Sequence, residues 1–580
     1  MPEPLPAAAL RRRAGRLVTA VGLAWLVLAG RLIQLQVWQQ ADLRDRAERQ
    51  REVVEDIAPR PGDIFDSQGR LLATTVRARS LFLIPSRIAK PSSVAEQLAA
   101  ALPVDADRLF EQLRAKSDAH FLWVRRRLSE DEVQRVRDLH LPSEIWGFRE
   151  EYRRVYPQGR LAAQVLGLRD IDGVGRGGIE ESCDAVLRGT AGRRVLNRDA
   201  LGRVIDIATD GQQPPRDGAP VTLTLDSVIQ LFAERTLDKL MAEWRPASCC
   251  AIVLEPPSGA VLAMASRPAF DPNDPADVPP EAWKNRAIAD MYEPGSTIKP
   301  MIVAYGLDSG AIQPDDLFDC EWGRYRMGRR WLHDHHPYGT LSLTDVLVKS
   351  SNIGMAKVGE RLTNAGLHQA VTQFGFGRAT GIELPGELPG VLRPLAQWTS
   401  YSTGSIPMGH EIAVTPLQLL AAHATLANGG LLVRPRIVKP VDDGGSDDFR
   451  HLAPQVVSAE VARWVVEGPM REVVSRGTGR RAQIPGYDVF GKTGTAQGLS
   501  PHGGYLHGQY LSSFVCGAPV DDPQVMVLVV VSQASQGGEA FGGVVAAPAA
   551  AEILREALVH RRIPATKPLP TAGKRVLDRR

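Results

Sequence analysis

One apolar stretch near the start of the chain constrains the fold more than any other feature. Arginines precede an uninterrupted apolar run from Leu17 to Gly30, and the apolar pattern resumes after Arg31 as far as Trp38. The run of 14 residues is shorter than the roughly 20 that cross a bilayer. Residues 17–38 together are long enough, because the Arg31 side chain can reach the membrane surface or face a partner helix. No second stretch of membrane length follows, so the rest of the chain has to fold on one side of a membrane.

Two interpretations fit this stretch: a retained anchor and a cleaved signal peptide, which also begins with basic residues. We favour the anchor, because Gly30-Arg31 does not resemble a small-x-small cleavage site and the apolar pattern continues beyond it. The basic flank then stays in the cytoplasm and the remaining chain is exported. The sequence therefore predicts a cytoplasmic tail over residues 1–16, a transmembrane anchor over residues 17–38, and a single-pass protein of the cytoplasmic membrane with its folded domains on the periplasmic or extracellular side.

The composition is that of a globular protein with more than one domain. Charged residues make up 23% and hydrophobic residues 44%, which are ordinary values, and 580 residues are too many for one compact domain. The net charge of +3 gives no reason to expect a nucleic-acid partner. The five cysteines are odd in number and lack C-x-x-C spacing, which argues against a disulfide framework or a structural zinc site. Adjacent Cys249 and Cys250 lie in an apolar run and are expected to face the two sides of a buried strand.

A polar stretch over residues 208–218, with two prolines and two glycines, is the best candidate for a domain boundary. Before it, residues 39–56 are typical of a helical stalk, whereas turn residues within 59–73 predict a strand, a tight turn and a second strand. The end of the chain is basic and contains proline, which is typical of a disordered tail. We therefore assign a pedestal domain to residues 39–215, a catalytic domain to residues 219–560 and a disordered basic tail to residues 561–580.

Strand patterns at both ends of the catalytic domain predict a single antiparallel sheet. Asp226 can cap a helix that runs to about Trp244. The expected strands cover residues 222–225, 250–254, 260–266, 510–517 and 525–532, and a last helix covers residues 546–560. Because helical material lies between these two sets, we expect an α+β fold in which N- and C-terminal elements close one sheet.

The first candidate for chemistry is a Ser-x-x-Lys motif at residues 296–299. The preceding Glu-Pro-Gly is typical of a turn into a helix, which places Ser296 and Lys299 one turn apart on one face. A serine hydroxyl is a poor nucleophile until its proton is removed, and a lysine amine can remove it where burial lowers the lysine pKa. Alone, the motif occurs at about chance frequency, and a surface serine and lysine would explain it equally well.

A second motif, Ser-x-Asn, begins at Ser350 after a helix-like segment. The Ser350 hydroxyl could relay a proton between the lysine and a leaving amine. The amide of Asn352 can donate to a substrate carbonyl and accept from Lys299. Taken alone, such a triplet is more often a helix cap or a turn.

A third motif, Lys492-Thr493-Gly494 followed by Thr495, has the pattern of an edge strand. Such a strand can take an extended peptide by β-addition. Lys492 and the Thr493 hydroxyl would then hold an anionic group, and Gly494 leaves room for close backbone approach. The three motifs in this order are far more specific than any one of them, and together they predict a serine acyl-transfer site whose base is a lysine.

The motifs resemble those of class B penicillin-binding proteins, which are membrane-anchored peptidoglycan D,D-transpeptidases. The middle Ser-x-Asn, in place of Ser-x-Asp, resembles division-type members more than elongation-type ones. One departure lies at residues 407–411, Pro-Met-Gly-His-Glu, where the family usually has Gly-x-Gly. Further matching segments cover nearly the whole chain, at residues 60–66, 154–157, 178–180, 267–273, 285–287, 415–418 and 427–430.

The resemblance implies both a fold and a mechanism. A β-lactamase-like transpeptidase domain, an antiparallel sheet with helices, would follow an elongated α+β pedestal of the dimerisation type and one transmembrane helix. Ser296 would attack the penultimate D-Ala of a stem pentapeptide and release the terminal D-Ala, and a neighbouring stem amine would then take the acyl group. Lys299 would be the base, supported by Ser350 and Asn352. No cofactor and no metal are implied.

The remaining roles follow the same resemblance. Lys492 and Thr493 would bind the terminal carboxylate, and the backbone N–H groups of Ser296 and Thr495 would form the oxyanion hole. β-Lactams would acylate Ser296. The implied partners are peptidoglycan stem peptides, β-lactams, the inner membrane, a glycan-polymerising membrane protein and other divisome or elongasome proteins.

Several alternatives stay open beside this reading. The chain could be an elongation-type transpeptidase, a D,D-carboxypeptidase or β-lactamase-like hydrolase in which water takes the acyl group, or a β-lactam sensor or division scaffold. The loop over residues 333–336, His-Asp-His-His, could wrap a metal, although its spacing and its Pro-Tyr-Gly flank favour a place at the rim of the cleft. Asp172 and Glu180 could form an acid pair, although packing and turn roles fit them better.

Overall fold

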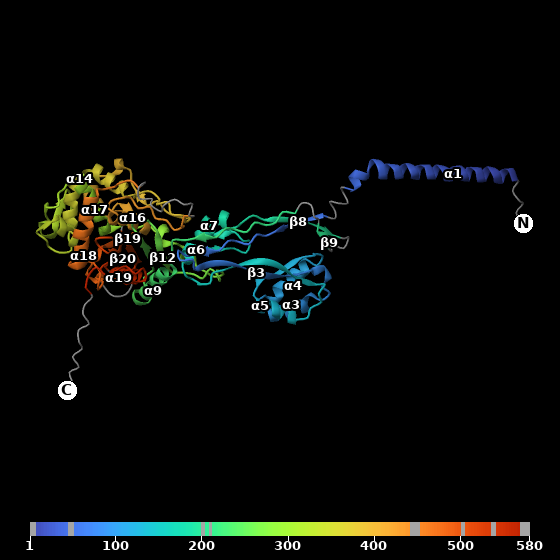
Figure 1. Cartoon of the computed structure of the whole chain (residues 1–580), viewed down its shortest axis with the longest axis horizontal. Helices are drawn as coiled ribbons and strands as arrows, with labels where there is room; N and C mark the ends of the chain where they lie inside the picture. The colour runs from blue at the N-terminus through green and yellow to red at the C-terminus, as the bar shows by residue number, and fades with distance from the viewer. Residues whose placement is uncertain are drawn as a thin grey trace, which may run out of the picture. The chain divides into compact units, whose positions relative to one another are not determined.

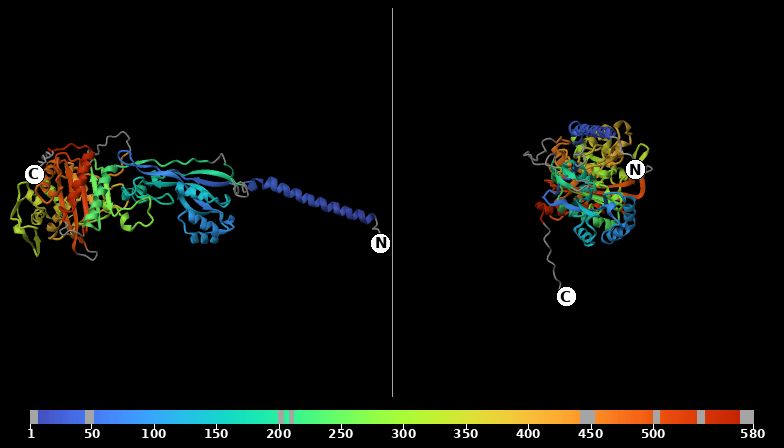
Figure 2. Two further views of the ribbon diagram at one scale, coloured as in Figure 1. Left: turned by 90° about the horizontal axis from the view of Figure 1, so that it is seen from below. Right: turned by 90° about the vertical axis from the view of Figure 1, so that its right-hand side faces the viewer.

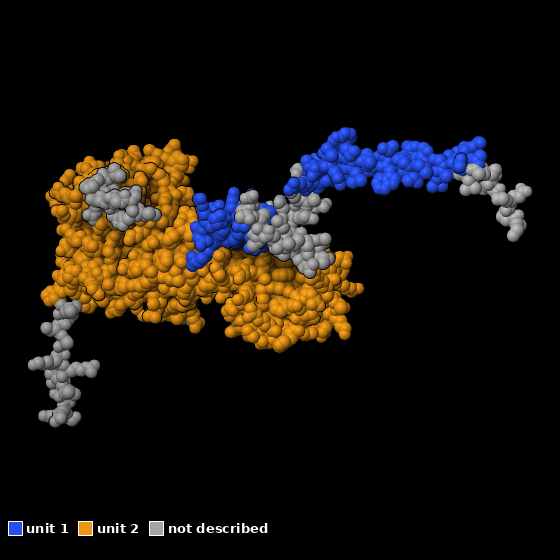
Figure 3. Space-filling view, turned by 45° about the vertical axis from the view of Figure 1, so that its right-hand side comes forward, with its two compact units in different colours: residues 1–60, 189–217 blue, residues 61–188, 218–580 orange. Residues whose placement is uncertain are grey.

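The computed structural model describes residues 7–44, 52–198, 204–207, 212–440, 453–499, 505–534 and 541–568. The chain divides into two compact units (Figure 3). The first consists of residues 1–60 and 189–217, and the second of residues 61–188 and 218–580.

The first unit contains the N-terminal helix and a small sheet. Helix α1 (Ala7–Ile33) continues into one π-helical turn, η1 (Gln34–Trp38). Residues 11–38 form the one helix in the described parts of the chain that is long and apolar enough to cross a membrane, and the predicted anchor lies within it. The three strands of the sheet, in the order β1-β8-β9, are β1 (Glu52–Ile57), β8 (Gly192–Arg198) and β9 (Val204–Ile207).

The helical stalk expected over residues 39–56 is wrong at its C-terminal end. Residues 45–51 lie outside the described residues, but Glu52–Ile57 form β1, antiparallel to β8. The adjacent valines Val53 and Val54 favour a strand, and the partner that stabilises this strand comes some 140 residues later, where Leu196 pairs with Val53. Local composition alone therefore favoured the wrong element.

The second unit begins with a pedestal built on a mixed sheet. The strand order is β10-β2-β3-β4, and β5 pairs with the long strand β3. Three helices cover one end of β3 and enclose a small core of leucine and valine side chains (Figure 1). The strands are β2 (Ile64–Phe65), β3 (Leu71–Leu83), β4 (Leu122–Leu128), β5 (Trp146–Val155) and β10 (Val221–Thr222), and the helices are α3 (Pro91–Ala101), α4 (Ala106–Ala115) and α5 (Glu130–Asp138). The strand, turn and strand predicted for residues 59–73 are confirmed as β2 and β3.

Asp66, in the turn between β2 and β3, joins the pedestal to the catalytic domain. Its carboxylate is fully buried and accepts hydrogen bonds from the Ser227 N–H (3.1 Å) and the Ser227 hydroxyl (2.7 Å) at the start of helix α9 (Ser227–Trp244). Asp226 caps the same helix by accepting from the Val228 N–H, as its position before the apolar pattern predicted. A carboxylate at a helix N-terminus is favoured by the helix dipole and by the unpaired N–H groups there.

The core of the catalytic domain is a five-stranded antiparallel sheet in the order β12-β11-β21-β20-β19. Strands from the end of the domain lie beside strands from its start, as predicted; in Figure 2 the red strands lie beside the green ones. The strands are β11 (Ser248–Leu254), β12 (Val261–Arg267), β19 (Phe490–Leu499), β20 (Tyr505–Ala518) and β21 (Val525–Ser532).

The sheet separates two apolar cores. Cys249 belongs to the core under α9 and the last helix, α19 (Ala546–His560), whereas Cys250 belongs to the core on the other face. The prediction that these two cysteines face opposite sides of a strand is confirmed. The second core is covered by α12 (Lys299–Asp308), α14 (Asn352–Gln373) and α16 (Pro416–Ala427).

Part of the expected C-terminal tail is placed against the domain. The carbonyl of Ile563 accepts from the Tyr487 hydroxyl at 2.8 Å, and the N–H groups of Thr566 and Lys567 donate to the Gly486 carbonyl at 2.9 and 3.0 Å. Residues 561–568 of the expected disordered tail therefore pack against the domain. Residues 569–580 lie outside the described residues.

Candidate active site

The predicted nucleophile lies in a tight turn that leads into α12. Residues Gly295–Ile298 form one 3-10 turn, and α12 follows at Lys299 without a break, so Ser296 and Lys299 lie one turn apart. Gly295 has φ +55°, and a Cβ at this position would come within 3.0 Å of the Thr495 carbonyl oxygen. On its other side the Gly295 N–H donates to the Gly409 carbonyl at 3.2 Å. The turn is therefore held between β19 and the loop at Gly409, with Ser296 partly exposed.

Lys299 is fully buried and surrounded by oxygen atoms of the second motif. Its Nζ donates to the Ser350 carbonyl (2.7 Å) and to Asn352 Oδ1 (2.9 Å), and lies 3.3 Å from both Ser350 Oγ and the Ser351 carbonyl. Removal from water lowers the pKa of Lys299 to about 7, and the negative charge of Asp334 opposes that shift. A neutral amine, which can accept a proton, is thus well populated near neutral pH.

The second motif joins α13 (Leu343–Val348) to α14. Hydrogen bonds to the loop residue Asp334 fix its backbone conformation. Ser350 has φ +60°, and Ser351 caps α14 by accepting from the Gly354 N–H at 2.9 Å. The Asp334 carboxylate accepts from the Ser351 hydroxyl (2.6 Å), from the Ile353 N–H (3.1 Å) and from the Asn352 N–H. Asp334 therefore fixes the segment that presents Ser350 and Asn352 to Lys299.

The loop at residues 333–336 thus contributes an anchor to the second motif. The Asn352 side-chain amide donates to the His333 carbonyl at 3.2 Å, and the His335 ring meets Phe541 edge to face at 5.9 Å. Within the described residues, no three His, Cys, Asp or Glu side chains are grouped closely enough to hold a metal ion. The loop lies against the second motif, and its expected place at the rim of a cleft stays a prediction.

The third motif lies on β19, which is at the edge of the described sheet. Lys492 is fully buried, and its Nζ donates to Ser350 Oγ at 3.0 Å. Burial, together with the positive charge of Lys299, lowers the pKa of Lys492 well below its ordinary value. The Ser350 hydroxyl therefore lies between two lysine amines, an arrangement that can pass a proton from one to the other.

Gly494 allows the nucleophile turn to approach β19. A Cβ there would come within 2.4 Å of Ser513 Oγ and 2.8 Å of Thr297 Cγ2, so no larger residue fits. Thr493 Oγ1 shares a 2.7 Å hydrogen bond with Thr478 Oγ1, and Thr495 Oγ1 accepts from the Gly542 N–H at 3.3 Å.

Three residues that support the site were not identified from the sequence. Asp334, which directly follows β15, was considered only as a metal ligand, although its role is to accept hydrogen bonds from the start of α14. Thr478 lies in a Gly-Thr-Gly triplet, and small residues beside a glycine-rich strand were the available signal. His423, fully buried in α16, donates from Nε2 to the Thr297 carbonyl at 2.8 Å, and burial lowers its pKa to about 4. Nothing in its local sequence distinguishes it from a core residue.

The acid pair considered for the pedestal does not form one site. Glu180 is fully buried between Arg154 (2.6 Å) and Arg169 (2.7 Å). Asp172 is largely exposed and pairs with Arg126 at 3.0 Å. Both carboxylates have structural partners, in agreement with packing and turn roles.

Comparison with known proteins agrees with this geometry. The model of the penicillin-binding protein transpeptidase domain matches residues 249–555, and that of the penicillin-binding protein dimerisation domain matches residues 56–223. The chain is 31% identical to the peptidoglycan D,D-transpeptidase FtsI of Escherichia coli, over 91% of this chain and 88% of that protein. It is 34% identical to stage V sporulation protein D of Bacillus subtilis, over 86% of this chain and 78% of that protein.

Solved structures show the same relationship. Penicillin-binding protein 3 from Mycobacterium tuberculosis, in complex with aztreonam, superposes with a TM-score of 0.68 and 27% identity, over 89% of this chain and 99% of that chain. The two family matches cover the pedestal first and the catalytic sheet second along the chain. The chain therefore belongs to the class B penicillin-binding proteins.

Proposed function

We propose that this chain is a peptidoglycan D,D-transpeptidase that forms an acyl-Ser296 intermediate. The observation that carries the proposal is the fully buried Lys299, one turn after Ser296, whose amine contacts both Ser350 and Asn352. A buried lysine with a pKa of about 7, which no carboxylate of the described residues contacts, is suited to take a proton from a serine. The similarity to the peptidoglycan D,D-transpeptidase FtsI supports the same activity.

Acylation follows from the placement of the three motifs. Neutral Lys299 takes the proton from Ser296 Oγ, which attacks the carbonyl carbon of the penultimate D-Ala of a stem peptide. The backbone N–H groups of Ser296 and Thr495 stabilise the oxyanion, a contribution of about 3 kcal/mol per donor in other acyl-transfer enzymes. The Ser350 hydroxyl, which contacts both lysine amines, passes a proton to the nitrogen of the leaving D-Ala as the peptide bond breaks.

The donor peptide extends along the open edge of β19. Main-chain hydrogen bonds to an edge strand give affinity for any extended peptide, and Lys492 with Thr493 supplies selectivity for a terminal carboxylate. An incoming carboxylate favours the charged form of Lys492, which burial disfavours in the free enzyme. A β-lactam presents a carboxylate and a reactive carbonyl in the same arrangement and would acylate Ser296 by the same route.

The second half of the reaction separates the transpeptidase from a hydrolase. Neutral Lys299 takes a proton from the amine of a neighbouring stem as that amine attacks the ester carbonyl. The new C–N bond forms, the ester C–O bond breaks, and Lys299 passes this proton to the leaving Ser296 oxygen. In a carboxypeptidase or a β-lactamase, water takes the place of the amine. The match to a dimerisation domain over residues 56–223 favours the transpeptidase, because a hydrolase needs no large pedestal.

The cellular role that we propose is septal wall synthesis by a single-pass membrane protein. The Ser-x-Asn motif and the likeness to FtsI support the division type over the elongation type. The basic flank of the anchor supports a cytoplasmic N-terminus and a periplasmic or extracellular catalytic domain. A glycan-polymerising membrane protein is the partner that this arrangement would serve.

The test of the chemistry is labelling with a fluorescent penicillin. We expect Ser296→Ala to abolish labelling, because the acyl group has no attachment point, whereas the exposed Ser400 in the same domain can be changed to Ala as a control without effect. An acyl-enzyme lifetime of hours agrees with a transpeptidase, and one of seconds indicates a β-lactamase. Undiminished labelling of the Ser296→Ala chain would contradict the proposal.

Depletion of the protein from cells separates the two cellular roles. Filamentous cells indicate a role in division, and spherical cells indicate a role in elongation.

A further inference from the structure

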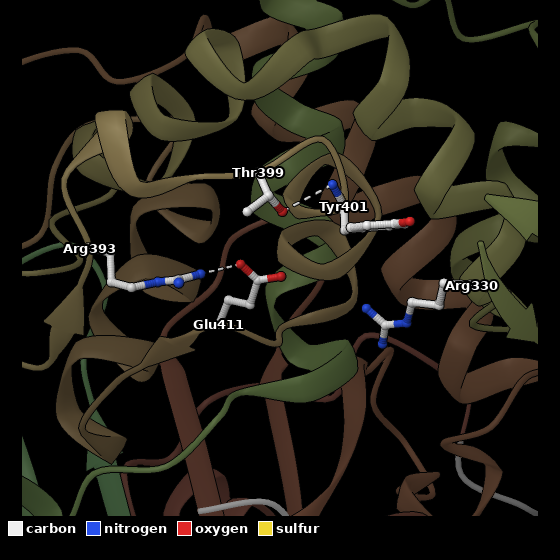
Figure 4. Close-up of a pocket in the computed structure, with 5 residues that line it drawn as sticks. All are labelled: Arg330, Arg393, Thr399, Tyr401 and Glu411. Atoms are coloured by element: carbon white, nitrogen blue, oxygen red, sulfur yellow. Dashed lines mark hydrogen bonds and ion pairs between the residues drawn. The ribbon is translucent and has the colours of Figure 1, made fainter. Parts of the chain in front are cut away.

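A pocket lies outside the three motifs, at the loop that contacts the nucleophile turn. Its volume is about 420 Å³, and it is lined by Arg330, Arg393, Thr399, Tyr401 and Glu411 (Figure 4). Arg330 begins strand β15 (Arg330–His333), which forms a hairpin with β14 (Arg324–Met327). The other four residues come from the segment 393–411, which includes the loop at Gly409.

The charges in this pocket leave one cation without an acidic partner. Glu411 pairs with Arg393 and also accepts from the Ser402 hydroxyl at 2.9 Å. Arg330 donates to Ser405 Oγ at 2.8 Å, but no carboxylate of the described residues lies within ion-pair distance of it. In Figure 4 both guanidinium groups point inward, with Glu411 between them. The pocket therefore has a net positive charge and is suited to an anion.

The pocket also contains a neutral hydrogen-bond donor, the Tyr401 hydroxyl. The Tyr401 side chain lines the pocket, and its oxygen accepts from the Arg329 N–H at 3.3 Å. Among the described residues no acceptor takes the proton of its own O–H, which a ligand can therefore use. A guanidinium and a phenol together can hold a carboxylate, which prefers charge-assisted hydrogen bonds and a planar donor pair. The dimensions of the pocket suit a carboxylate with the first atoms of a peptide attached.

The backbone shows that Glu411 is retained at a position better suited to glycine. Gly409 and Glu411 have φ of +82° and +64°, so both adopt the left-handed conformation that the usual Gly-x-Gly of the family would adopt. A residue with a Cβ has a higher conformational energy there than glycine. Here the Glu411 side chain holds Arg393 in an ion pair, so that Arg330 is the cation that remains available.

The pocket is connected to both sides of the catalytic serine. The Glu411 N–H donates to Glu293 Oε1 at 3.0 Å, three residues before Ser296. Strand β15, which begins with Arg330, leads directly to Asp334, the anchor of the second motif. Because the nucleophile turn lies between β19 and the loop at Gly409, the pocket and the donor strand are on different sides of Ser296.

We propose that this pocket is a carboxylate subsite for the acceptor stem peptide, an inference that rests on the proposed transpeptidase function. The donor peptide and its terminal carboxylate occupy β19 and Lys492. The acceptor brings an amine to the acyl-Ser296 carbonyl from the other side, and its free C-terminal carboxylate binds Arg330 and the Tyr401 hydroxyl. This contact positions the amine and selects a peptide over water as the acyl acceptor.

The test compares two acceptors on the full-length chain. A thioester donor that mimics the D-alanyl-D-alanine end is supplied with a synthetic stem peptide whose C-terminal carboxylate is free, or with the same peptide amidated. The ratio of transfer to hydrolysis is measured for each. We expect the parent chain to favour the free carboxylate about ten-fold, the magnitude of one hydrogen bond to a charged group, and Arg330→Gln to lose this preference.

Two further variants keep the result interpretable. Arg326→Gln changes an exposed arginine of the same hairpin, which stacks on Trp331 and does not line the pocket, and we expect it to keep the full preference. Glu411→Gly preserves the left-handed backbone and releases Arg393, and we expect it to increase the preference further. Because each variant is compared with itself on two acceptors, partial loss of folding does not alter the ratio.

The outcomes separate this inference from the proposed function. An equal ratio for both acceptors in the parent chain, or an unchanged ten-fold preference in Arg330→Gln, would overturn the subsite. If the preference that depends on Arg330 is lost when the donor is amidated, and not when the acceptor is amidated, the pocket binds the donor. That result would also overturn the inference. A parent chain that forms no acyl-Ser296 contradicts the transpeptidase itself.

Discussion

The pedestal and the catalytic domain both bury charged side chains, but they do so in opposite ways. In the pedestal, Glu180 is fully buried between Arg154 and Arg169, and the Tyr156 hydroxyl adds a hydrogen bond at 3.2 Å. In the catalytic domain, two lysine amines, those of Lys299 and Lys492, share one serine hydroxyl. In the pedestal the negative charge of the acid is compensated by the two arginines. In the catalytic domain the two amines would repel each other if both were protonated.

This difference separates a structural site from a reactive one. A buried acid between two arginines is stabilised by its partners, and removal of one partner leaves an uncompensated charge. A buried lysine without a carboxylate in contact is driven towards its neutral form, and a neutral amine is a base. The same loss of water therefore maintains an ion network in the pedestal and, in the mechanism that we propose, provides the base for Ser296.

The largest effect that we expect from breaking this comparison is at Lys299. Lys299→Met removes the base, and we expect the rate of acylation by a fluorescent penicillin to fall about 10³-fold, within the range known for general-base catalysis. Methionine fills a similar volume but leaves the oxygens around Lys299 without their donor, so a thermal melt of the variant is the control for folding. Labelling at the parent rate would show that another group removes the proton from Ser296.

The next largest effect is expected in the pedestal. Glu180→Gln leaves Arg154 and Arg169 without their common acid, and we expect a loss of about 3 kcal/mol in unfolding free energy, which is typical of a broken buried pair. Asp172→Asn, which breaks an exposed pair with Arg126 in the same domain, should cost less than about 1 kcal/mol. Hydrogen exchange of pedestal peptides in increasing urea measures both variants. Equal protection in the two would show that burial of Glu180 has no energetic consequence.

The smallest effect concerns the pH dependence of acylation. With a Lys299 pKa of about 7, the acylation rate should rise about ten-fold per pH unit below that value and level off above it. The Asp334 charge raises the pKa of Lys299, so Asp334→Asn lowers this pKa and should shift the midpoint of the profile to lower pH. The exposed Asp319 of the same domain, changed to Asn, is the control. A midpoint that stays in place or moves upward would contradict the role assigned to Asp334.

Elements that depend on local sequence were predictable. The cap Asp226, the edge strand at Lys492 and the alternation of Cys249 and Cys250 all follow from short patterns, because helix caps and strand faces depend on neighbours in the chain. The order of the three motifs indicated that Ser296, Ser350 and Lys492 meet. Their hydrogen bonds could not be derived, because they depend on how segments 51 and 142 residues apart pack together.

The elements that were missed depend on distant partners. Strand β1 forms because β8 pairs with it, and its own composition suggested a helix. Asp334 acquires its role only when the hairpin of β14 and β15 folds against α14. The pocket at Arg330 likewise joins the hairpin to residues 393–411, and neither segment by itself shows a binding site.

The strand order of the catalytic sheet has a consequence for how the chain reaches its native state. Ala251 on β11 pairs with Val529 on the central strand β21, so the middle of the sheet joins the first and last parts of the domain. Contacts between such distant segments slow folding, because a long loop has to close before they form. The sheet cannot be completed until nearly the whole domain has been synthesised. The unfinished domain has to remain unaggregated during that interval, and we expect this period to be when the chain depends most on folding helpers.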